Sequence, residues 1–298
     1  MPQDHLPTPE GPADLRLTRR TLGGLMFTGY AAAALGAQAN PIVTDEAGII
    51  TDQVSFVGSS AGDYPPSLPG YLARPEGTGP YPVVIVANEI FGLHAYIQDV
   101  CRRLAKQGYV AFAPGYFARA GDPASLTTFP EIMAIVRATP QAQVLADTGA
   151  ALAWLGSQPW ADVAHAGITG FCWGGNVVWM ACAAHDFKAG AAWYGQLVRP
   201  AQTTEEGRRW PVEIAAELRC PVLGLYGELD EGISQDNVAD MRAALAAAGR
   251  TDSEIVVYPG AAHGFHADYR PMYNATAAAD GWSRMSRLFA DRLGGQIA

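Results

Sequence analysis

A cysteine at position 172 lies in the segment 170–175, which reads Gly-Phe-Cys-Trp-Gly-Gly. The apolar run 167–171 leads into it, and a helical pattern follows it. This order predicts a strand, a sharp turn and a helix, with the thiol at the apex and glycines that let strand and helix approach closely. A thiolate at that helix N-terminus would be stabilised by the helix dipole and by free backbone amides. Cys172 is therefore a candidate nucleophile.

Two further side chains complete a pattern typical of acyl transfer. Asp230 follows the apolar run 222–226, and His263 follows the apolar run 255–258. The chain order nucleophile, acid, histidine is that of α/β hydrolases, where all three lie at one edge of the sheet. We expect His263 to act as general base and then general acid, and Asp230 to orient its imidazole.

Each of these residues also has a purely structural interpretation. A buried cysteine usually acts as a small apolar side chain, and Asp230 could cap the helix expected to begin near Gln235. By position, His266 is as eligible as His263. The functional interpretation depends on the order and register of the three residues taken together.

The elements that position these residues alternate along the chain. Two extended segments near the start, 51–57 and 70–74, predict an antiparallel lead-in. Short apolar strands and helices then alternate, which predicts an α/β fold with a mostly parallel central sheet and helices on both faces. Ligands of such a sheet bind beyond the carboxyl ends of its strands. The expected strands are 83–87, 110–114, 167–171, 190–194, 222–226 and 255–258, and the expected helices are 95–107, 141–156, 174–184, 236–249 and 276–293.

The end of the expected strand 83–87 supplies more of the site. Glu89 follows this strand and places a carboxylate at the same crevice. Hydrolases of this fold take one oxyanion-binding amide from this loop and another from the residue after the nucleophile, which points to the N–H groups of Ile90 and Trp173. Losing one such donor typically costs about 3–4 kcal/mol of transition-state stabilisation.

These segments resemble the dienelactone hydrolase (carboxymethylenebutenolidase) family, within the α/β-hydrolase superfamily. The resemblance extends over roughly residues 70–293, and the combination of a cysteine elbow with the Glu-Ile-Phe-Gly segment is its most specific part. The motifs that carry it are 88–92, 107–109, 116–119, 170–175, 193–195, Asp230 and 260–265.

The resemblance implies a carboxylic ester hydrolase that forms a cysteine thioester with the triad Cys172, Asp230 and His263. It also implies that Glu89 takes the thiol proton when substrate binds. A thiol with an ordinary pKa of about 8.5 is mostly neutral at pH 7, and a permanent thiolate would invite oxidation. Generating the thiolate in place solves both problems.

The expected substrate is a small ester or lactone. The family holds the carboxylate of its lactone with two arginines, one of them four residues after the histidine, where this chain has Ala267. Arg270 is near but out of register, and Arg137 is a candidate for the second arginine, so dienelactone itself is not the expected substrate. The long connection 196–218 is expected to shape the pocket mouth. The expected pocket side chains are Phe91, Tyr116, Tyr194, Phe265 and Arg270.

Composition limits the partners. The chain has 298 residues, 49% of them apolar, and a net charge of −9 without a basic run, which argues against nucleic-acid binding. Its four cysteines form no C-x-x-C pair, and its sequence carries no metal or cofactor motif. We therefore expect a monomer or weak homodimer that acts on a small molecule without cofactor or metal.

Residues 1–39 differ from the rest of the chain. They contain Arg19-Arg20, a weakly apolar run over 22–36 and the small-residue segment Ala37-Gln38-Ala39. This pattern is typical of a twin-arginine export signal, so we expect a periplasmic or secreted single domain over 40–298 with no stable membrane association after processing. The alternative is an uncleaved tail or membrane anchor, and without a signal the protein would be cytoplasmic.

Two other functions remain open at this stage. Cys172 could be a redox thiol, which peroxide consumption without ester hydrolysis would indicate. The chain could also be an inactive binding module that keeps the pocket, in which case an acylating probe would not label Cys172.

Overall fold

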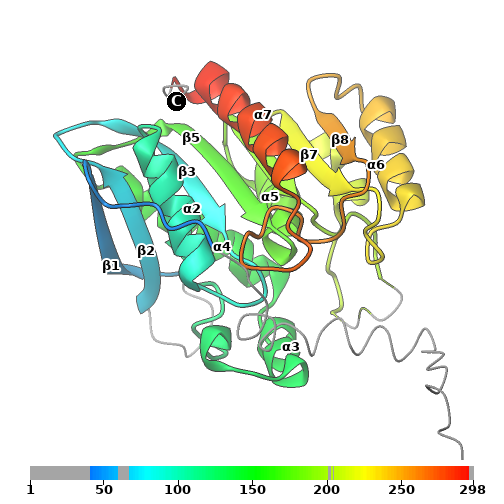
Figure 1. The fold of residues 1–298 in the computed structure, drawn as a ribbon, viewed down its shortest axis with the longest axis horizontal. Helices are drawn as coiled ribbons and strands as arrows, with labels where there is room; N and C mark the ends of the chain where they lie inside the picture. Colours follow the sequence, from blue (N-terminus) through cyan, green and yellow to red (C-terminus); the bar gives the residue numbers. More distant parts are fainter. Residues whose placement is uncertain (1–40, 60–66, 201–202, 204, 295–298) are drawn as a thin grey trace, which may run out of the picture.

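A computed structural model describes residues 41–59, 67–200, 203 and 205–294. These residues form an eight-stranded sheet in the order β1-β2-β4-β3-β5-β6-β7-β8, with helices on both faces (Figure 1). The strands are β1 (Ile49–Val57), β2 (Ser67–Pro75), β3 (Tyr81–Ala87), β4 (Val110–Pro114), β5 (Ala161–Phe171), β6 (Ala189–Trp193), β7 (Val222–Gly227) and β8 (Glu254–Tyr258). The helices are α2 (Ala95–Lys106), α3 (Phe129–Arg137), α4 (Gln141–Gly156), α5 (Trp173–Ala184), α6 (Gln235–Ala247) and α7 (Ala275–Leu293).

The predicted fold class is confirmed. β1 and β2 pair antiparallel, β2 joins β4 antiparallel, and every pairing from β4 through β3 to β8 is parallel. Neighbouring residues of β3 explain why its sequence is continuously apolar. Val83 and Ile85 lie in the core on one face of the sheet, whereas Val84 and Val86 lie in the core on the other, and all four are fully buried.

Two helical layers enclose the sheet. Helices α2 and α7 bury their apolar sides in the core that contains Val84, and they lie together over one face in Figure 1. Helices α4, α5 and α6 contribute to the core that contains Ile85. The carboxyl ends of β3, β5, β7 and β8 consequently meet at one edge, where the site residues follow them.

Helix α3 was not expected from the sequence, and neither were the short 3-10 turns Pro123–Ser125, Pro211–Glu213 and Ala215–Glu217. Helix α3 has only 9 residues, a length at which periodicity is a weak signal. It matters because it supplies part of the pocket wall described below. The predicted export signal over 1–39 lies outside the described residues, so it stays a prediction, as do its processing and the boundary at residue 40.

A buried ion pair joins three parts of the chain that are distant in sequence. The guanidinium of Arg119, in the loop after β4, binds the carboxylate of Asp147 on α4, and the side chains are 3% and 0% exposed. The N–H and hydroxyl groups of Ser59 donate to the same carboxylate at 2.8 and 2.7 Å. The pair therefore fixes the chain after β1 against α4.

Within the described part of the chain, no helix is long and apolar enough to cross a membrane.

Replacing Asp147 with alanine tests this ion pair. Because Asp147→Ala leaves the Arg119 charge buried without its partner, we expect the free energy of unfolding to fall by about 3–5 kcal/mol. Urea denaturation measures it. The matched control is Asp186→Ala, which removes the exposed pair with Arg219 (side chains 85% and 52% exposed) and should leave stability nearly unchanged. Equal effects of the two substitutions would contradict a structural role for the buried pair.

Candidate active site

Cys172 lies at a strained turn between β5 and α5. Its backbone has φ 56° and ψ −115°, a conformation that residues other than glycine rarely adopt. Glycines make this turn possible, as the sequence predicts. A Cβ on Gly170 would lie 2.4 Å from the carbonyl oxygen of Gly174, and one on Gly174 would lie 2.2 Å from that of Ala87. The turn is therefore pressed against the end of β3.

The loop after β6 holds the same turn from the other side. The Cys172 N–H donates to the carbonyl of Trp193 at 3.0 Å, and a Cβ on Gly195 would lie 2.2 Å from the carbonyl carbon of Gly175. Between these contacts, Tyr194 also has a positive φ, 40°. Cys172 and Tyr194 are the described non-glycine residues with this backbone strain, and they are neighbours across β5 and β6.

The structure brings Cys172, His263 and Asp230 together. His263 Nδ1 lies 2.7 Å from Asp230 Oδ2, and the imidazole also hydrogen-bonds the Cys172 side chain. The other carboxylate oxygen of Asp230 accepts the N–H groups of Gly232 and Ile233 at 2.9 and 3.1 Å. The cap of α6 is Ser234, so Asp230 does not serve as the helix cap.

The charges around His263 favour its protonated form. Burial lowers the pKa of this imidazole, but the interactions with the Cys172 sulfur and the Asp230 carboxylate outweigh burial and raise the pKa well above its ordinary value. The side chain remains 34% exposed, so it is open to the pocket. An imidazole in this position can take a proton from a nucleophile and return it to a leaving group.

His266, the alternative histidine, has a different environment. It is buried between aromatic rings, stacking with Phe171 and Trp282, and its Nδ1 lies 2.5 Å from the Tyr96 hydroxyl. Burial and the Arg103 charge lower the pKa of His266 to about 3. It therefore stays neutral and acts as a packed hydrogen-bond acceptor.

Glu89 lies beyond β3 and is fully buried. Its Oε2 accepts the Tyr269 hydroxyl at 2.8 Å and lies 3.2 Å from His94 Nε2, while Oε1 has no hydrogen-bond partner among the described residues. Tyr194 and Tyr269 each interact electrostatically with both Glu89 and Cys172. The carboxylate and the thiol therefore face the same group of side chains.

A pocket of about 570 Å³ opens over Cys172 and His263. Ile90 and Trp173, the residues expected to supply the oxyanion-binding amides, both line it. The remaining lining residues are Met133, Val136, Arg137, Asn176, Tyr194, Gln196, Pro200, Thr203, Glu205, Arg208 and Trp210.

Of the five side chains expected in the pocket, Tyr194 lines it and the other four lie elsewhere. Tyr116 and Phe265 are fully buried in the core, because each ring packs among other aromatic side chains. Phe91 lies edge-on to His94, and Arg270 is buried beside the ring of Tyr269. Sequence spacing placed these residues near the correct loops but could not indicate which way each side chain turns.

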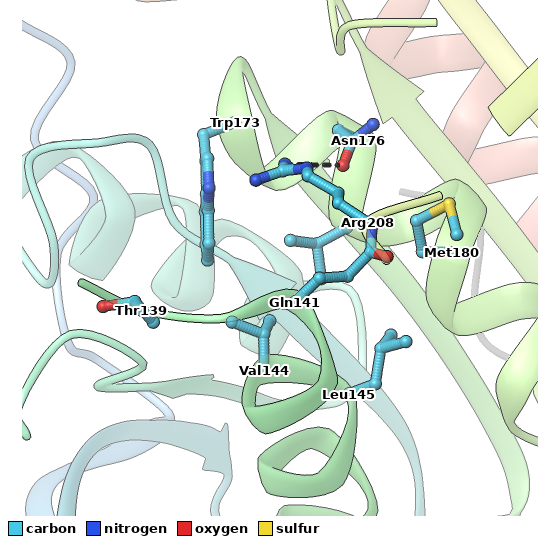
Figure 2. Close-up of a pocket in the computed structure, with 9 residues that line it drawn as sticks. Thr139, Gln141, Val144, Leu145, Trp173, Asn176, Met180 and Arg208 are labelled. Carbon is cyan, nitrogen blue, oxygen red and sulfur yellow. Dashed lines mark hydrogen bonds between the residues drawn. The ribbon is translucent and has the colours of Figure 1, made fainter. Parts of the chain in front are cut away.

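Arg137 and Arg208 bring positive charge to the pocket. Arg137, the candidate from sequence, ends helix α3 and is exposed. Arg208 comes from the long connection 196–218, and its guanidinium stacks 4.7 Å from the Trp210 ring and donates to Glu205 Oε2 at 3.1 Å. Figure 2 shows Arg208 reaching over the start of α5 toward Asn176, whose Oδ1 it meets at 3.4 Å. The connection 196–218 was expected at the pocket mouth from its length, but nothing in the sequence singled out Arg208.

The described residues contain no cluster of histidine, cysteine and acidic side chains suited to hold a metal ion. The Cys172 thiol and the His263 imidazole line the pocket, and the Asp230 carboxylate contacts that imidazole, an arrangement that can support acyl transfer.

Comparisons with known proteins agree with this geometry. A model of the dienelactone hydrolase family matches residues 68–293. A Methylorubrum extorquens relative, named as a carboxymethylenebutenolidase, is 45% identical over 282 residues, which are 93% of this chain and 94% of that protein. An Escherichia coli strain K12 relative of the same name is 44% identical over 266 residues, which are 88% of this chain and 94% of that protein. The crystal structure of a Klebsiella pneumoniae protein described as a dienelactone hydrolase is 44% identical, with a TM-score of 0.76 over 81% of this chain and 98% of that chain.

Replacing Asp230 with asparagine tests the electrostatics of the site. Asp230→Asn removes one of the charges that raise the pKa of His263, so we expect that pKa to fall in an NMR titration of the imidazole. We also expect kcat to fall on the order of 10³- to 10⁴-fold, because the imidazolium loses its support. Asp240→Asn, an exposed position on α6, is the control. A His263 titration that is the same in wild type and Asp230→Asn would show that the pair does not control this imidazole.

Proposed function

Because this chain belongs to the dienelactone hydrolase family, and is thus a hydrolase, we propose that it cleaves small esters or lactones through a thioester on Cys172. The observation that carries the proposal is the contact of Cys172 with His263, and of His263 with Asp230, at the floor of one pocket. All three lie beyond the carboxyl ends of strands, where ligands of such sheets bind.

The reaction has two halves. The Cys172 thiolate attacks the carbonyl carbon, and the alcohol leaves with a proton from His263, so that a thioester remains on the sulfur. A water molecule then gives a proton to His263 and attacks the thioester. The sulfur leaves as a thiolate, the acid is released, and the proton held by Glu89 returns to the sulfur to restore the thiol. Asp230 holds Nδ1 of the imidazole throughout, which leaves Nε2 to face the reacting atoms.

The oxyanion of each tetrahedral intermediate would bind the N–H groups of Ile90 and Trp173, which line the pocket beside the sulfur. Trp173 begins α5, so its amide also carries the positive end of the helix dipole. Glu89 would receive the thiol proton on Oε1, the oxygen that has no partner in the described structure. The thiolate is then formed only as substrate enters.

The substrate we propose bears a carboxylate near its ester or lactone group. The relatives above are named for a lactone with a carboxymethylene group, and the position of one family arginine is Ala267 in this chain. Arg208 and Arg137 supply guanidinium groups from the mouth of the pocket instead. Guanidinium suits a carboxylate because it donates two parallel hydrogen bonds.

Among the four cysteines, all of which the structure describes, only Cys172 is not buried. The Cys182 thiol hydrogen-bonds Cys220, and burial raises the pKa of Cys101 and Cys182 well above the ordinary value. Of the four thiols, that of Cys172 is therefore the one placed to react with a molecule in the pocket.

Replacing Cys172 with alanine tests the mechanism. We expect Cys172→Ala to abolish turnover of an activated aryl ester and to keep the wild-type circular dichroism and melting temperature, because only the nucleophile is lost. Cys101→Ala is the matched control and should retain activity. Hydrolysis at the wild-type rate by Cys172→Ala would refute the thioester mechanism, and peroxide consumption without ester hydrolysis by the wild type would favour a redox thiol.

Replacing Arg208 with glutamine tests the substrate class. A pair of esters that differ only in a free or a methylated carboxylate separates charge recognition from the chemical step. We expect Arg208→Gln to lower kcat/KM for the free acid about tenfold more than for its methyl ester, which corresponds to about 1.4 kcal/mol. Arg219→Gln, an exposed arginine paired with Asp186, is the control. An equal loss for both substrates would show that Arg208 does not recognise the carboxylate.

A further inference from the structure

Two side chains meet Glu89 Oε2: the Tyr269 hydroxyl donates a hydrogen bond to it, and the imidazole of His94 lies within ion-pair distance. His94, at the N-cap of α2, places Nε2 3.2 Å from Glu89 Oε2. Tyr269 contacts the same oxygen, but burial and the Glu89 carboxylate raise the pKa of this phenol well above its ordinary value, so it remains a neutral donor. His94 is therefore the partner whose charge can change.

Aromatic rings fix the imidazole of His94. It stacks on Tyr96 with a centroid distance of 6.0 Å, and it meets Tyr269 and Phe91 edge-on at 5.4 and 5.9 Å. The His94 side chain is 18% exposed, whereas Glu89 is fully buried. The ring thus has its buried Nε2 end at the carboxylate, while the side chain as a whole keeps some contact with solvent.

Other charged and titratable groups lie in this region, either in electrostatic contact with Glu89 or beside the tyrosines that interact with it. They are Tyr96 and Arg103 on α2, Cys172 at the elbow, Tyr194 after β6, and Asp268, Tyr269 and Arg270 after β8. The tyrosines have pKa values raised by burial and so stay neutral. Arg103 is engaged by Asp99 and Asp268.

We propose that His94 is a positioning residue that keeps Glu89 charged and correctly oriented to take the proton of the Cys172 thiol. Burying a carboxylate without a cation is costly, and an imidazole 3.2 Å away removes much of that cost when it carries a proton on each nitrogen. It also engages Oε2 and so leaves Oε1 free for the proton. In this step the S–H bond breaks and an O–H bond forms on Oε1, which yields a thiolate and a neutral carboxylic acid.

This inference rests on the proposed function, and a set of variants separates the two. His94→Gln keeps a side-chain N–H donor but cannot carry charge. We expect it to lower kcat for ester hydrolysis about tenfold with little change in KM. In a plot of kcat against pH, the fall in kcat on the acid side should begin at higher pH than in the wild type, because a carboxylate takes up a proton more readily without a cation beside it. Tyr269→Phe, which removes a neutral donor, should lower kcat without moving the pH at which that fall begins.

A double-mutant cycle shows whether His94 acts through Glu89. In the Glu89→Gln background, His94→Gln should cause no further loss of kcat, whereas independent effects would multiply. The matched control is His165→Gln, an exposed histidine paired with Asp162, which should keep the wild-type profile.

Two results would overturn the role of His94: multiplicative losses in the cycle, or an unchanged pH profile in His94→Gln. If Cys172→Ala still hydrolyses the ester, the proposed function fails instead, so the two failures are distinguishable.

Discussion

The whole site depends on the close approach of backbone at the Cys172 turn. A strained residue of this kind costs about 1–3 kcal/mol and persists only where its surroundings fix it. Here the surroundings are backbone on two sides, since Gly174 abuts the end of β3 and Gly175 abuts Gly195 after β6. The same contacts set the sulfur beside the loop that carries Glu89 and Ile90. The strained backbone of Cys172 and the position of its sulfur beside the loop 88–92 are thus products of one packing arrangement.

Environment also gives the two buried carboxylates different tasks. Asp230 is anchored by two backbone amides and by His263, so its charge is held in place and serves to orient the imidazole. Glu89 is held on one oxygen only, by a tyrosine and a histidine, and its second oxygen is left without a partner in the described structure. A fully satisfied carboxylate is a poor proton acceptor, whereas a half-satisfied one is ready to take a proton.

Most of the architecture could be predicted because the apolar pattern that identifies each strand or helix lies within that element's own sequence. Continuous apolar runs such as 83–87 indicate strands covered on both faces, and the order of Cys172, Asp230 and His263 follows from strand-end positions. The directions of Phe265 and Tyr116, which point into the core, depend on packing between elements distant in sequence. Arg208 was missed for the same reason: nothing in its neighbours indicates that the connection folds back onto α5. Periodicity reports burial within an element and carries no information about docking of an irregular segment.

The triad residues and the arginines of the pocket come from different kinds of segment, and this difference bears on substrate specificity. Cys172, Asp230 and His263 follow the ends of sheet strands, where a change of backbone would disturb the core, whereas α3 and the connection 196–218 place Arg137 and Arg208 in the pocket wall. Loops of this kind tolerate substitution better than strands do. A pocket assembled in this way can change the acid it recognises without altering Cys172, His263 or Asp230. In this chain position 267 is a fully buried alanine, whereas Arg137 and Arg208 line the pocket, so a carboxylate on the substrate would have to extend toward α3 and the connection 196–218 to meet a guanidinium.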